Sequence, residues 1–299
     1  MDDRVRGKRR TIKVNVTIIG GAGRMGRWLI RHFLSQKKDV TISDVRFEEA
    51  KRIAESYGVK LAKDNQEAVK EADLIVISTP IRVTPDLLRE IAPSVKKDAV
   101  VSEISSLKSQ VVPILTEMAK QNVKPLSIHP LFGPGAQKLE EERIALIPVV
   151  DPSFELKTVE NLFPGAEVIV VDAEEHDRAM ALTLSLPHFL NMIFASVIGE
   201  EDLNALKKLG GTTFTLQLTL SESVMNEDPL LYSSIQMNNE YTVQYLNRFL
   251  SKAEEARDWI IKKDEKRFSK FYYYVQGLLS RDEDFYKAYE RMYRALEAL

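Results

Sequence analysis

The feature that most constrains the fold is a glycine-rich turn between an apolar run and a helical pattern, in the segment VTIIGGAGRMGRWLI at residues 16–30. In the pattern G-x-G-x-x-G, the first glycine permits the tight turn, the second lets the backbone approach a pyrophosphate, and the third lets helix and strand pack closely. Gly21, Gly23 and Gly26 fit this pattern. The following helix would direct its free N–H groups and positive dipole end at the phosphates. We expect a dinucleotide to contact the loop residues Gly21, Gly23, Arg24, Met25 and Gly26.

An acidic residue lies where a dinucleotide-binding fold places the group that binds the ribose hydroxyls. A second apolar run, at residues 40–43, ends at Asp44, which is 18 residues after Gly26. A carboxylate at this point accepts hydrogen bonds from the adenosine ribose and repels a 2′-phosphate. Arg46 acts in the opposite direction, because a guanidinium can pair with that phosphate. The sequence therefore predicts NAD as the cofactor.

Composition and charge indicate a protein of two domains without a nucleic-acid or membrane partner. The 299 residues exceed one typical domain, and 42 Lys+Arg against 44 Asp+Glu give a net charge of −2. The absence of cysteine excludes disulfides, thiolate catalysis and cysteine metal ligands, and no metal site is expected. No apolar stretch approaches the roughly 18 residues needed to span a bilayer, and no signal-peptide pattern begins the chain. We expect a cytoplasmic protein.

The pattern of apolar residues divides the chain into an α/β half and a helical half. The first half alternates helical segments with short β-type runs, which is typical of a parallel sheet. Beyond the first two strands, such runs are found at residues 74–77, 99–103, 125–128, 144–150 and 167–171. Helical periodicity dominates after Asp172. We predict a Rossmann-type dinucleotide-binding domain over residues 12–172 and an all-helical substrate-binding and dimerisation domain over residues 173–299.

The helical half holds more apolar and aromatic residues than a bundle of its size needs. Examples are Phe189, Phe194, Tyr241, Tyr245, Phe249, Phe271, Tyr274 and Tyr286. Surface of this kind is commonly buried against a second copy around a two-fold axis. A homodimer is therefore expected.

Candidate chemistry follows from the places where the predicted strands end. Ligands of parallel sheets bind beyond the carboxyl ends of the strands. This rule selects the glycine loop, the turn Ser78-Thr79-Pro80, the segment 103–108 and His129. An imidazole has an ordinary pKa that suits proton acceptance near neutrality. From its position alone, His129 is equally compatible with catalysis and with a structural hydrogen bond.

Several motifs, in the same order, resemble those of the prephenate and arogenate dehydrogenase family over nearly the whole chain after about Lys13. Residues 18–26 resemble the family's G-x-G-x-M-G loop, and Ser78, Thr79 and Pro80 match its post-strand turn, which contacts the cofactor. Further matches are EISSLK at 103–108 to D-x-G-S-x-K, HPLFGP at 129–134 to H-P-M-F-G-P, EHD at 175–177 and LPH at 186–188. The H-P-x-F-G-P and L-P-H elements together are specific, whereas the glycine loop alone is not.

The resemblance implies an NAD-dependent oxidative decarboxylation of prephenate to 4-hydroxyphenylpyruvate in tyrosine biosynthesis. His129 would accept the proton of the ring hydroxyl, and Ser106 would hydrogen-bond near His129 and the nicotinamide. Lys108, counted with the substrate-binding residues, would help orient its loop. His188 would contact the substrate from the helical domain, so the site would form in the cleft between domains. His176 is interpreted as a structural residue near a helix start.

The chain departs from the family pattern in ways that affect substrate recognition. Glu103 and Ser105 replace an aspartate and a glycine, and no Lys or Arg lies between Lys208 and Arg248, where many members supply an arginine. A dianionic substrate needs charge-assisted partners to leave water. The candidates are a basic residue of a second subunit and the side chains of His188, Lys207, Lys208, Arg248, Gln217, Gln236 and Asn239. Arogenate, whose side chain carries an amine, is therefore the nearest alternative substrate.

Two other classes of protein share parts of this pattern. A β-hydroxyacid dehydrogenase has a similar two-domain plan, but it relies on a catalytic lysine in the helical domain and lacks the H-P-x-F-G-P turn. A catalytically silent NAD-binding regulatory protein would keep the glycine loop and lose the histidine. Because His129, Ser106 and Lys108 are all present, the enzyme is the favoured interpretation.

Overall fold

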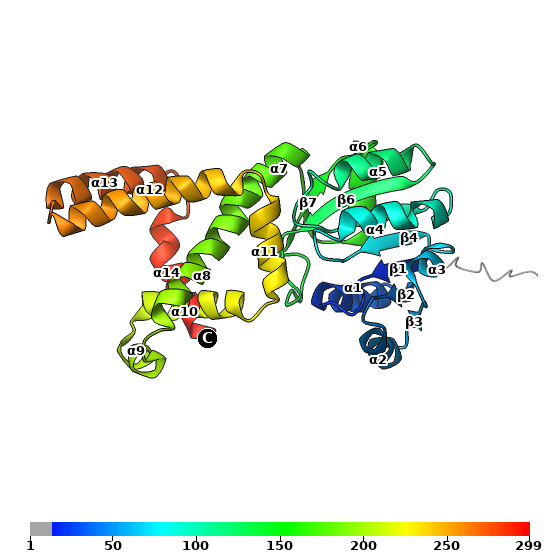
Figure 1. Ribbon diagram of the computed structural model, residues 1–299, viewed down its shortest axis with the longest axis horizontal. Helices are drawn as coiled ribbons and strands as arrows, with labels where there is room; N and C mark the ends of the chain where they lie inside the picture. Colours follow the sequence, from blue (N-terminus) through cyan, green and yellow to red (C-terminus); the bar gives the residue numbers. More distant parts are fainter. Residues whose placement is uncertain (1–13) are drawn as a thin grey trace, which may run out of the picture. The chain divides into compact units, whose positions relative to one another are not determined.

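The structure, a computed structural model, describes residues 14–299 and divides into two compact units (Figure 1). The first unit ends at Asp177 and is built of strands and helices, and the second runs from Arg178 to Leu299 and is helical. The predicted fold class is confirmed. The predicted domain boundary at residue 172 stays a prediction; the compact units divide a few residues later, and residues 12 and 13 lie outside the described part of the chain.

The first unit contains a sheet whose strand order is β3-β2-β1-β4-β5-β6-β7-β8. Its strands are β1 (Asn15–Ile19), β2 (Asp39–Ser43), β3 (Lys60–Leu61), β4 (Leu74–Ile77), β5 (Val100–Glu103), β6 (Lys124–Pro130), β7 (Arg143–Ile147) and β8 (Glu167–Val170). Neighbouring strands are parallel except β6 and β7, which pair antiparallel with His129 opposite Ala145. The strand order reverses between β1 and β4, and ligands of open α/β sheets bind at such a reversal.

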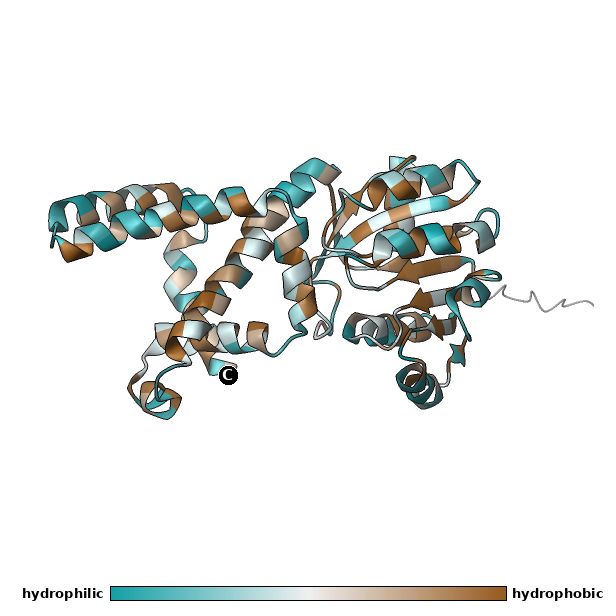
Figure 2. Cartoon of the chain, in the orientation of Figure 1, coloured by the Kyte–Doolittle hydropathy of each residue, from teal (hydrophilic) through white to brown (hydrophobic). Residues whose placement is uncertain are grey.

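Alternation along the strands supplies two apolar faces, each covered by helices. Val16 and Ile18 belong to one cluster, with α1 (Arg24–Ser35), α2 (Phe47–Tyr57) and α6 (Pro152–Leu162). Ile75 and Ile77 belong to the other, with α3 (Asn65–Val69), α4 (Thr84–Ile91) and α5 (Val112–Ala119). The predominance of brown along the strands in Figure 2 reflects this burial on both faces, which is typical of parallel sheets.

The second unit is a set of helices around the segment that follows α7 (Ala173–Met180). A π-helical turn, η2 (Ala181–Ser185), leads into α8 (Leu186–Ile198), which packs against α10, and η2 contacts α11 and α12. The remaining bounds are α9 (Leu203–Leu209), α10 (Thr212–Met225), α11 (Pro229–Asn238), α12 (Thr242–Ile261), α13 (Glu265–Leu279) and α14 (Ala288–Glu297); two 3₁₀ turns are η1 (Ala92–Ser94) and η3 (Phe285–Lys287).

One helix corrects an expectation drawn from the sequence. The continuous helix Ala173–Ile198 holds an 18-residue window of mean hydropathy 1.6, so by length and composition it could cross a membrane. The expectation that no apolar stretch approaches this length is therefore wrong. Only 17% of the window is buried inside the chain, and Leu190, Ile193 and Val197 are exposed on one face of the helix.

Candidate active site

The glycine loop after β1 shows why each of its glycines is needed. Gly20 has φ +87°, and a Cβ there would lie 2.3 Å from the Ser78 carbonyl oxygen. Gly20, one residue before the first glycine of the motif, adopts the left-handed conformation that favours glycine, and Gly21 lies in the same turn. Gly21 is required because a Cβ there would lie 2.6 Å from the Cβ of Ile42. The turn is therefore packed against both neighbouring strands.

The start of helix α1 has the form of a phosphate site. A Cβ on Gly26 would lie 2.2 Å from the Gly20 carbonyl oxygen, so only glycine lets the helix approach the turn, as the motif predicts. Gly23 is the N-cap and supplies no side-chain hydrogen bond, and Arg24 and Met25 begin the helix. The first-turn N–H groups of a helix have no partners within it, so they are directed at any anion bound there.

Asp44, just after β2, is hydrogen-bonded both to the glycine loop and to Arg46. Its Oδ2 accepts the Ala22 N–H at 3.0 Å, and its Oδ1 accepts the Arg46 N–H at 2.9 Å and Arg46 Nε at 3.3 Å. Arg46 also pairs with Glu49 at 3.1 Å. Two carboxylates therefore hold the Arg46 guanidinium, and the Asp44 oxygens keep lone pairs for further donors.

The turn Ser78-Thr79-Pro80 lies beside the glycine loop. The Ser78 N–H donates to the Ile19 carbonyl at 2.8 Å, and Thr79 Oγ1 is 3.0 Å from Thr84 Oγ1 at the start of α4. The structure thus brings together three of the predicted cofactor elements: the glycine loop, Asp44 and this turn. Their contact with a cofactor stays a prediction.

A buried ion pair holds the segment after β5. Glu103 Oε1 accepts Lys108 Nζ at 2.7 Å and also the Ser127 hydroxyl, and its Oε2 accepts the Ser105 N–H at 2.8 Å. Lys108 Nζ donates further to the Ile128 carbonyl at 2.6 Å, and both charged side chains are 0% exposed. Burial lowers the pKa of Lys108, and the neighbouring Glu103 carboxylate opposes that change.

This arrangement agrees with the loop-orienting role predicted for Lys108, and its place among the substrate-binding residues stays a prediction. The enclosed, paired ammonium group of Lys108 joins its loop to the end of β6. The two departures from the family pattern both take part: Glu103 supplies the carboxylate, and the Ser105 hydroxyl donates to Thr84 Oγ1 at 3.3 Å. Ser106 is half-buried in the same loop, and its proximity to a nicotinamide stays a prediction.

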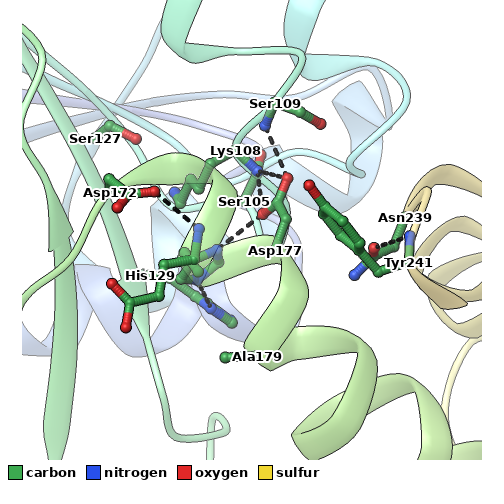
Figure 3. A network of polar contacts seen from close by, with 12 residues as sticks. Ser105, Lys108, Ser109, Ser127, His129, Asp172, Asp177, Ala179, Asn239 and Tyr241 are labelled. Carbon is green, nitrogen blue, oxygen red and sulfur yellow. Dashed lines mark hydrogen bonds and ion pairs between the residues drawn. The ribbon is translucent and has the colours of Figure 1, made fainter. Parts of the chain in front are cut away.

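Two histidines and an aspartate form a line of hydrogen bonds at the end of β6 (Figure 3). His129 Nδ1 lies 3.0 Å from His176 Nε2, and His176 Nδ1 lies 2.9 Å from Asp177 Oδ1. His129 is 7% exposed, and His176 and Asp177 are each 2% exposed. For a neutral His176, the order of the three groups sets the proton positions, since a carboxylate only accepts hydrogen bonds.

Assigning protons along this line gives His129 a free basic nitrogen. Asp177 accepts from His176 Nδ1, which leaves the Nε2 of neutral His176 as an acceptor. With His176 in this neutral form, His129 Nδ1 carries its hydrogen and donates to His176. The lone pair of neutral His129 is therefore on Nε2. A histidine held in one tautomer by an acceptor behind it is suited to take a proton from a bound ligand.

The charges around this line keep His129 neutral and Asp177 ionised. Burial, with smaller effects from Lys108 and His176, lowers the pKa of His129 well below 6.5. Burial opposes ionisation of Asp177, but hydrogen bonds from His176 and from the Ser109 and Lys108 N–H groups outweigh it and lower the pKa of Asp177. Asp177 accepts those two N–H groups at 2.9 Å each. It therefore joins the Lys108 loop to the His129 line.

Sequence reasoning missed the part that His176 and Asp177 take in this site. His176 was interpreted as structural because of its place near a helix start. That place in the sequence does not predict its contact with His129, which lies at a strand end 47 residues earlier. The available signal was the match of EHD at 175–177 to a family element.

In the helical unit, His188 lies in a polar cluster on α8. Its ring meets the Tyr232 ring edge-on, with centroids 4.5 Å apart, and burial lowers the pKa of His188. One turn along α8, Asn191 Oδ1 accepts Gln217 Nε2 at 2.9 Å and the Ser221 hydroxyl at 2.8 Å. The cluster is built from neutral hydrogen-bonding groups.

The cationic candidates for carboxylate binding lie on exposed side chains. Lys207 pairs with Glu222 at 3.0 Å, Arg248 lies over the Tyr245 ring at 5.4 Å, and Lys208 is exposed. Asn239 is buried, and its Oδ1 accepts the Tyr241 N–H at 3.0 Å. Of the candidates within the unit, Gln217, Gln236 and His188 are the ones with partly buried side chains placed around α8.

Two family models match adjoining parts of the chain. The model described as prephenate dehydrogenase, nucleotide-binding domain, matches residues 31–171, and the model described as prephenate dehydrogenase, dimerization domain, matches residues 172–273. Together they cover most of the chain. The first match begins after the glycine loop, so it is independent of that motif.

Curated relatives and a solved structure agree with these models. A probable arogenate/prephenate dehydrogenase of Methanocaldococcus jannaschii is 27% identical over 86% of this chain and 59% of its own length. The T-protein of Enterobacter agglomerans is 25% identical over 85% of this chain and 64% of its own length. The chain thus spans about three-fifths of these relatives. The prephenate dehydrogenase of A. aeolicus, solved with hydroxyphenyl propionate and NAD+, has the same fold, with TM-score 0.71 at 18% identity over 90% of this chain and 98% of that one.

Proposed function

Because the chain belongs to the prephenate dehydrogenase family, we propose that it is an NAD-dependent oxidoreductase of tyrosine biosynthesis that oxidatively decarboxylates prephenate or its amino-acid counterpart arogenate. The observation that carries the proposal is the buried line from Asp177 through His176 to His129, at a strand end of the unit that holds the glycine loop. A silent NAD-binding protein has no need of a histidine held in the basic tautomer.

The reaction needs little covalent help from the protein. When bound, NAD+ accepts hydride from the ring carbon that bears the hydroxyl. The hydroxyl proton passes to a base, and loss of the ring carboxylate as CO2 leaves its bonding electrons in the ring, which becomes an aromatic phenolate. That phenolate takes the proton back, so no net proton is released. The protein must therefore position the ring and hold one proton during the reaction.

His129 is the residue suited to hold that proton. Its Nε2 is free to accept from the ring hydroxyl, because Nδ1 donates to His176. Positive charge that develops on His129 is stabilised through His176 by the Asp177 carboxylate. Because burial lowers the pKa of His129, the imidazole is neutral at physiological pH and returns the proton readily. His176 and Asp177 act as positioning residues.

Two other predicted residues complete the proposal. Ser106, in the loop fixed by the Glu103–Lys108 ion pair, hydrogen-bonds beside His129 and the nicotinamide. His188, in the helical unit, contacts the substrate and contributes to binding more than to proton transfer. Many family members supply an arginine for carboxylate binding in the region that corresponds to residues 209–247, and this chain has no Lys or Arg there.

We expect a preference for NAD+ over NADP+. Asp44 would repel a 2′-phosphate, and Arg46 is held by both Asp44 and Glu49. The values of kcat/KM for the two cofactors measure this preference. Asp44→Ser is expected to reduce it, because the repelling carboxylate is removed and Arg46 loses one of its two partners. A wild-type preference for NADP+ would show that Asp44 does not act in this way.

We also expect a homodimer through the helical unit, acting in the cytoplasm. The exposed apolar face of α8 at Leu190, Ile193 and Val197 lies within residues 172–273, which match the dimerization-domain model. Light scattering should give about twice the chain mass of 34.0 kDa. Leu190→Glu with Ile193→Lys should shift the mass toward the monomer, and a wild-type monomer at micromolar concentration would contradict the assignment.

The proposed function is tested by supplying the purified chain with NAD+ and either prephenate or arogenate and following NADH. We expect reduction with at least one substrate, with an aromatic product. The absence of NADH with both substrates, in a protein that binds NAD+, would favour the silent regulatory protein.

A further inference from the structure

The helical unit contains two buried polar atoms without a hydrogen-bond partner. Among the described residues only three such side-chain atoms occur, and two of them are His188 Nδ1 and Gln236 Oε1. A buried acceptor left unpaired costs the free energy of its desolvation, so such atoms are rare unless a ligand or solvent completes them. His188 lies in α8 and Gln236 lies in α11.

Two contacts place these atoms along the same seam between α8 and α11. The His188 ring meets the Tyr232 ring at 4.5 Å, and Gln236 Nε2 donates to the Ser185 carbonyl at 2.7 Å. Tyr232 and Gln236 are four residues apart on α11. Ser185, at the end of η2, and His188, in the first turn of α8, are three residues apart on one continuous helix. Residues at these spacings share a helix face. His188 and Gln236 therefore lie along one line of contact.

The orientation of the Gln236 amide is fixed by its partner. The Ser185 carbonyl only accepts hydrogen bonds, so the atom 2.7 Å from it must be the NH2 group. The Ser185 hydroxyl is separately engaged, as it accepts from the Thr242 hydroxyl at 3.0 Å. Gln236 Oε1 is therefore an acceptor that faces away from Ser185 and requires a donor from elsewhere.

The charges of the unit restrict which ligand can supply that donor. A carboxylate would be repelled by an amide oxygen, whereas an ammonium group donates to it. The three cationic candidates for a carboxylate, Lys207, Lys208 and Arg248, are exposed, and Lys207 is paired with Glu222. A neutral cluster accommodates a zwitterionic side chain at lower cost than an anionic keto-acid side chain.

Resting on the proposed function, we propose that Gln236 is a specificity-determining residue whose Oε1 accepts a hydrogen bond from the ammonium group of the substrate's side chain. The chain then prefers the α-amino acid substrate, arogenate, over the α-keto acid substrate, prephenate. His188, on the same seam, is left to bind another part of that side chain.

Gln236→Met tests this proposal, because methionine has nearly the same length and no polar atoms. We expect wild type to have the higher kcat/KM for arogenate, and the substitution to lower that value about 10- to 100-fold, as for loss of a buried hydrogen bond to a charged group. The value for prephenate should change less than about 3-fold. Gln276→Met is the matched control: this glutamine is exposed on α13, so the same substitution there should leave the ratio of the two values unchanged.

A binding measurement separates failure of this proposal from failure of the proposed function. In calorimetry, wild type should bind L-tyrosine, which carries the ammonium group, more tightly than 3-(4-hydroxyphenyl)propionate, which lacks it, and Gln236→Met should remove the difference. NADH formation with a preference for prephenate, or an equal loss for both substrates in Gln236→Met, would overturn the role of Gln236 alone. No NADH with either substrate would overturn the proposed function, and equal binding of the two phenolic ligands would then overturn the role of Gln236 as well.

Discussion

His129→Asn is expected to lower kcat by about 10² to 10⁴, the usual contribution of a positioned general base, while KM changes little. In wild type, His129 Nδ1 lies 3.0 Å from His176 Nε2 and donates to it. The asparagine amide of the variant can still donate to His176 Nε2, so the buried line keeps its hydrogen bond. What the variant loses is the nitrogen that accepts the substrate proton. Steady-state kinetics with the preferred substrate, together with an unchanged thermal unfolding midpoint, separate loss of the base from loss of the fold.

The pH dependence of kcat gives this prediction a second test. A proton-accepting histidine must be neutral, so kcat should rise with pH through its ionisation. Because burial lowers the pKa of His129 well below 6.5, the rise should lie on the acid side of the ordinary histidine range. In His129→Asn that rise should be absent.

His188→Asn is the comparison that decides between the two histidines. It should mainly raise KM, because His188 is proposed to hold the substrate rather than to react. If His129→Asn kept nearly wild-type kcat while His188→Asn abolished it, the base would have to be sought in the helical unit.

Lys108→Met is expected to lower the free energy of unfolding by about 3 to 5 kcal/mol, the largest stability effect we predict. The substitution leaves Glu103 fully buried without its counterion, since both side chains are 0% exposed and 2.7 Å apart. The Ile128 carbonyl also loses its donor. Denaturant unfolding with a common slope for wild type and variant measures the change.

A matched ion pair on the surface tests whether burial, rather than the ion pair as such, is responsible for this loss of stability. Lys120 and Glu117 are also 2.7 Å apart, but both side chains are 67% exposed. Lys120→Met should therefore change the free energy of unfolding by less than about 1 kcal/mol. The double variant Glu103→Met with Lys108→Met should recover most of the loss, because no charge is left unpaired. If Lys108→Met and Lys120→Met lowered the free energy of unfolding equally, burial of the Glu103–Lys108 pair would not be the cause of the loss.

The sequence predicted most of the first unit because its signals are local. Glycines at fixed spacing, an acid after the second strand and alternating apolar runs each report on a few neighbouring residues. The same local reasoning did not select Gly20, which precedes the motif, and only the observed φ of +87° shows that the turn needs this glycine as well.

The parts of the site that could not be predicted from the sequence depend on contacts between residues that are distant along the chain. Lys108 was expected to help orient its loop, and only the fold shows that it does so by donating to Glu103 and to the Ile128 carbonyl. His176 was interpreted as structural because its 3.0 Å contact with His129 joins a helix to a strand end. The direction of the Gln236 amide likewise depends on Ser185, 51 residues away.

The stoichiometry of NADH and CO2 tests the central proposal most directly. Purified chain, NAD+ and the preferred substrate should give one NADH and one CO2 for each aromatic product formed, because hydride loss and decarboxylation are parts of one reaction at one ring. His129→Asn should slow both products by the same factor. NADH formed without CO2 would instead indicate a simple hydroxyacid dehydrogenase and would contradict the proposed function.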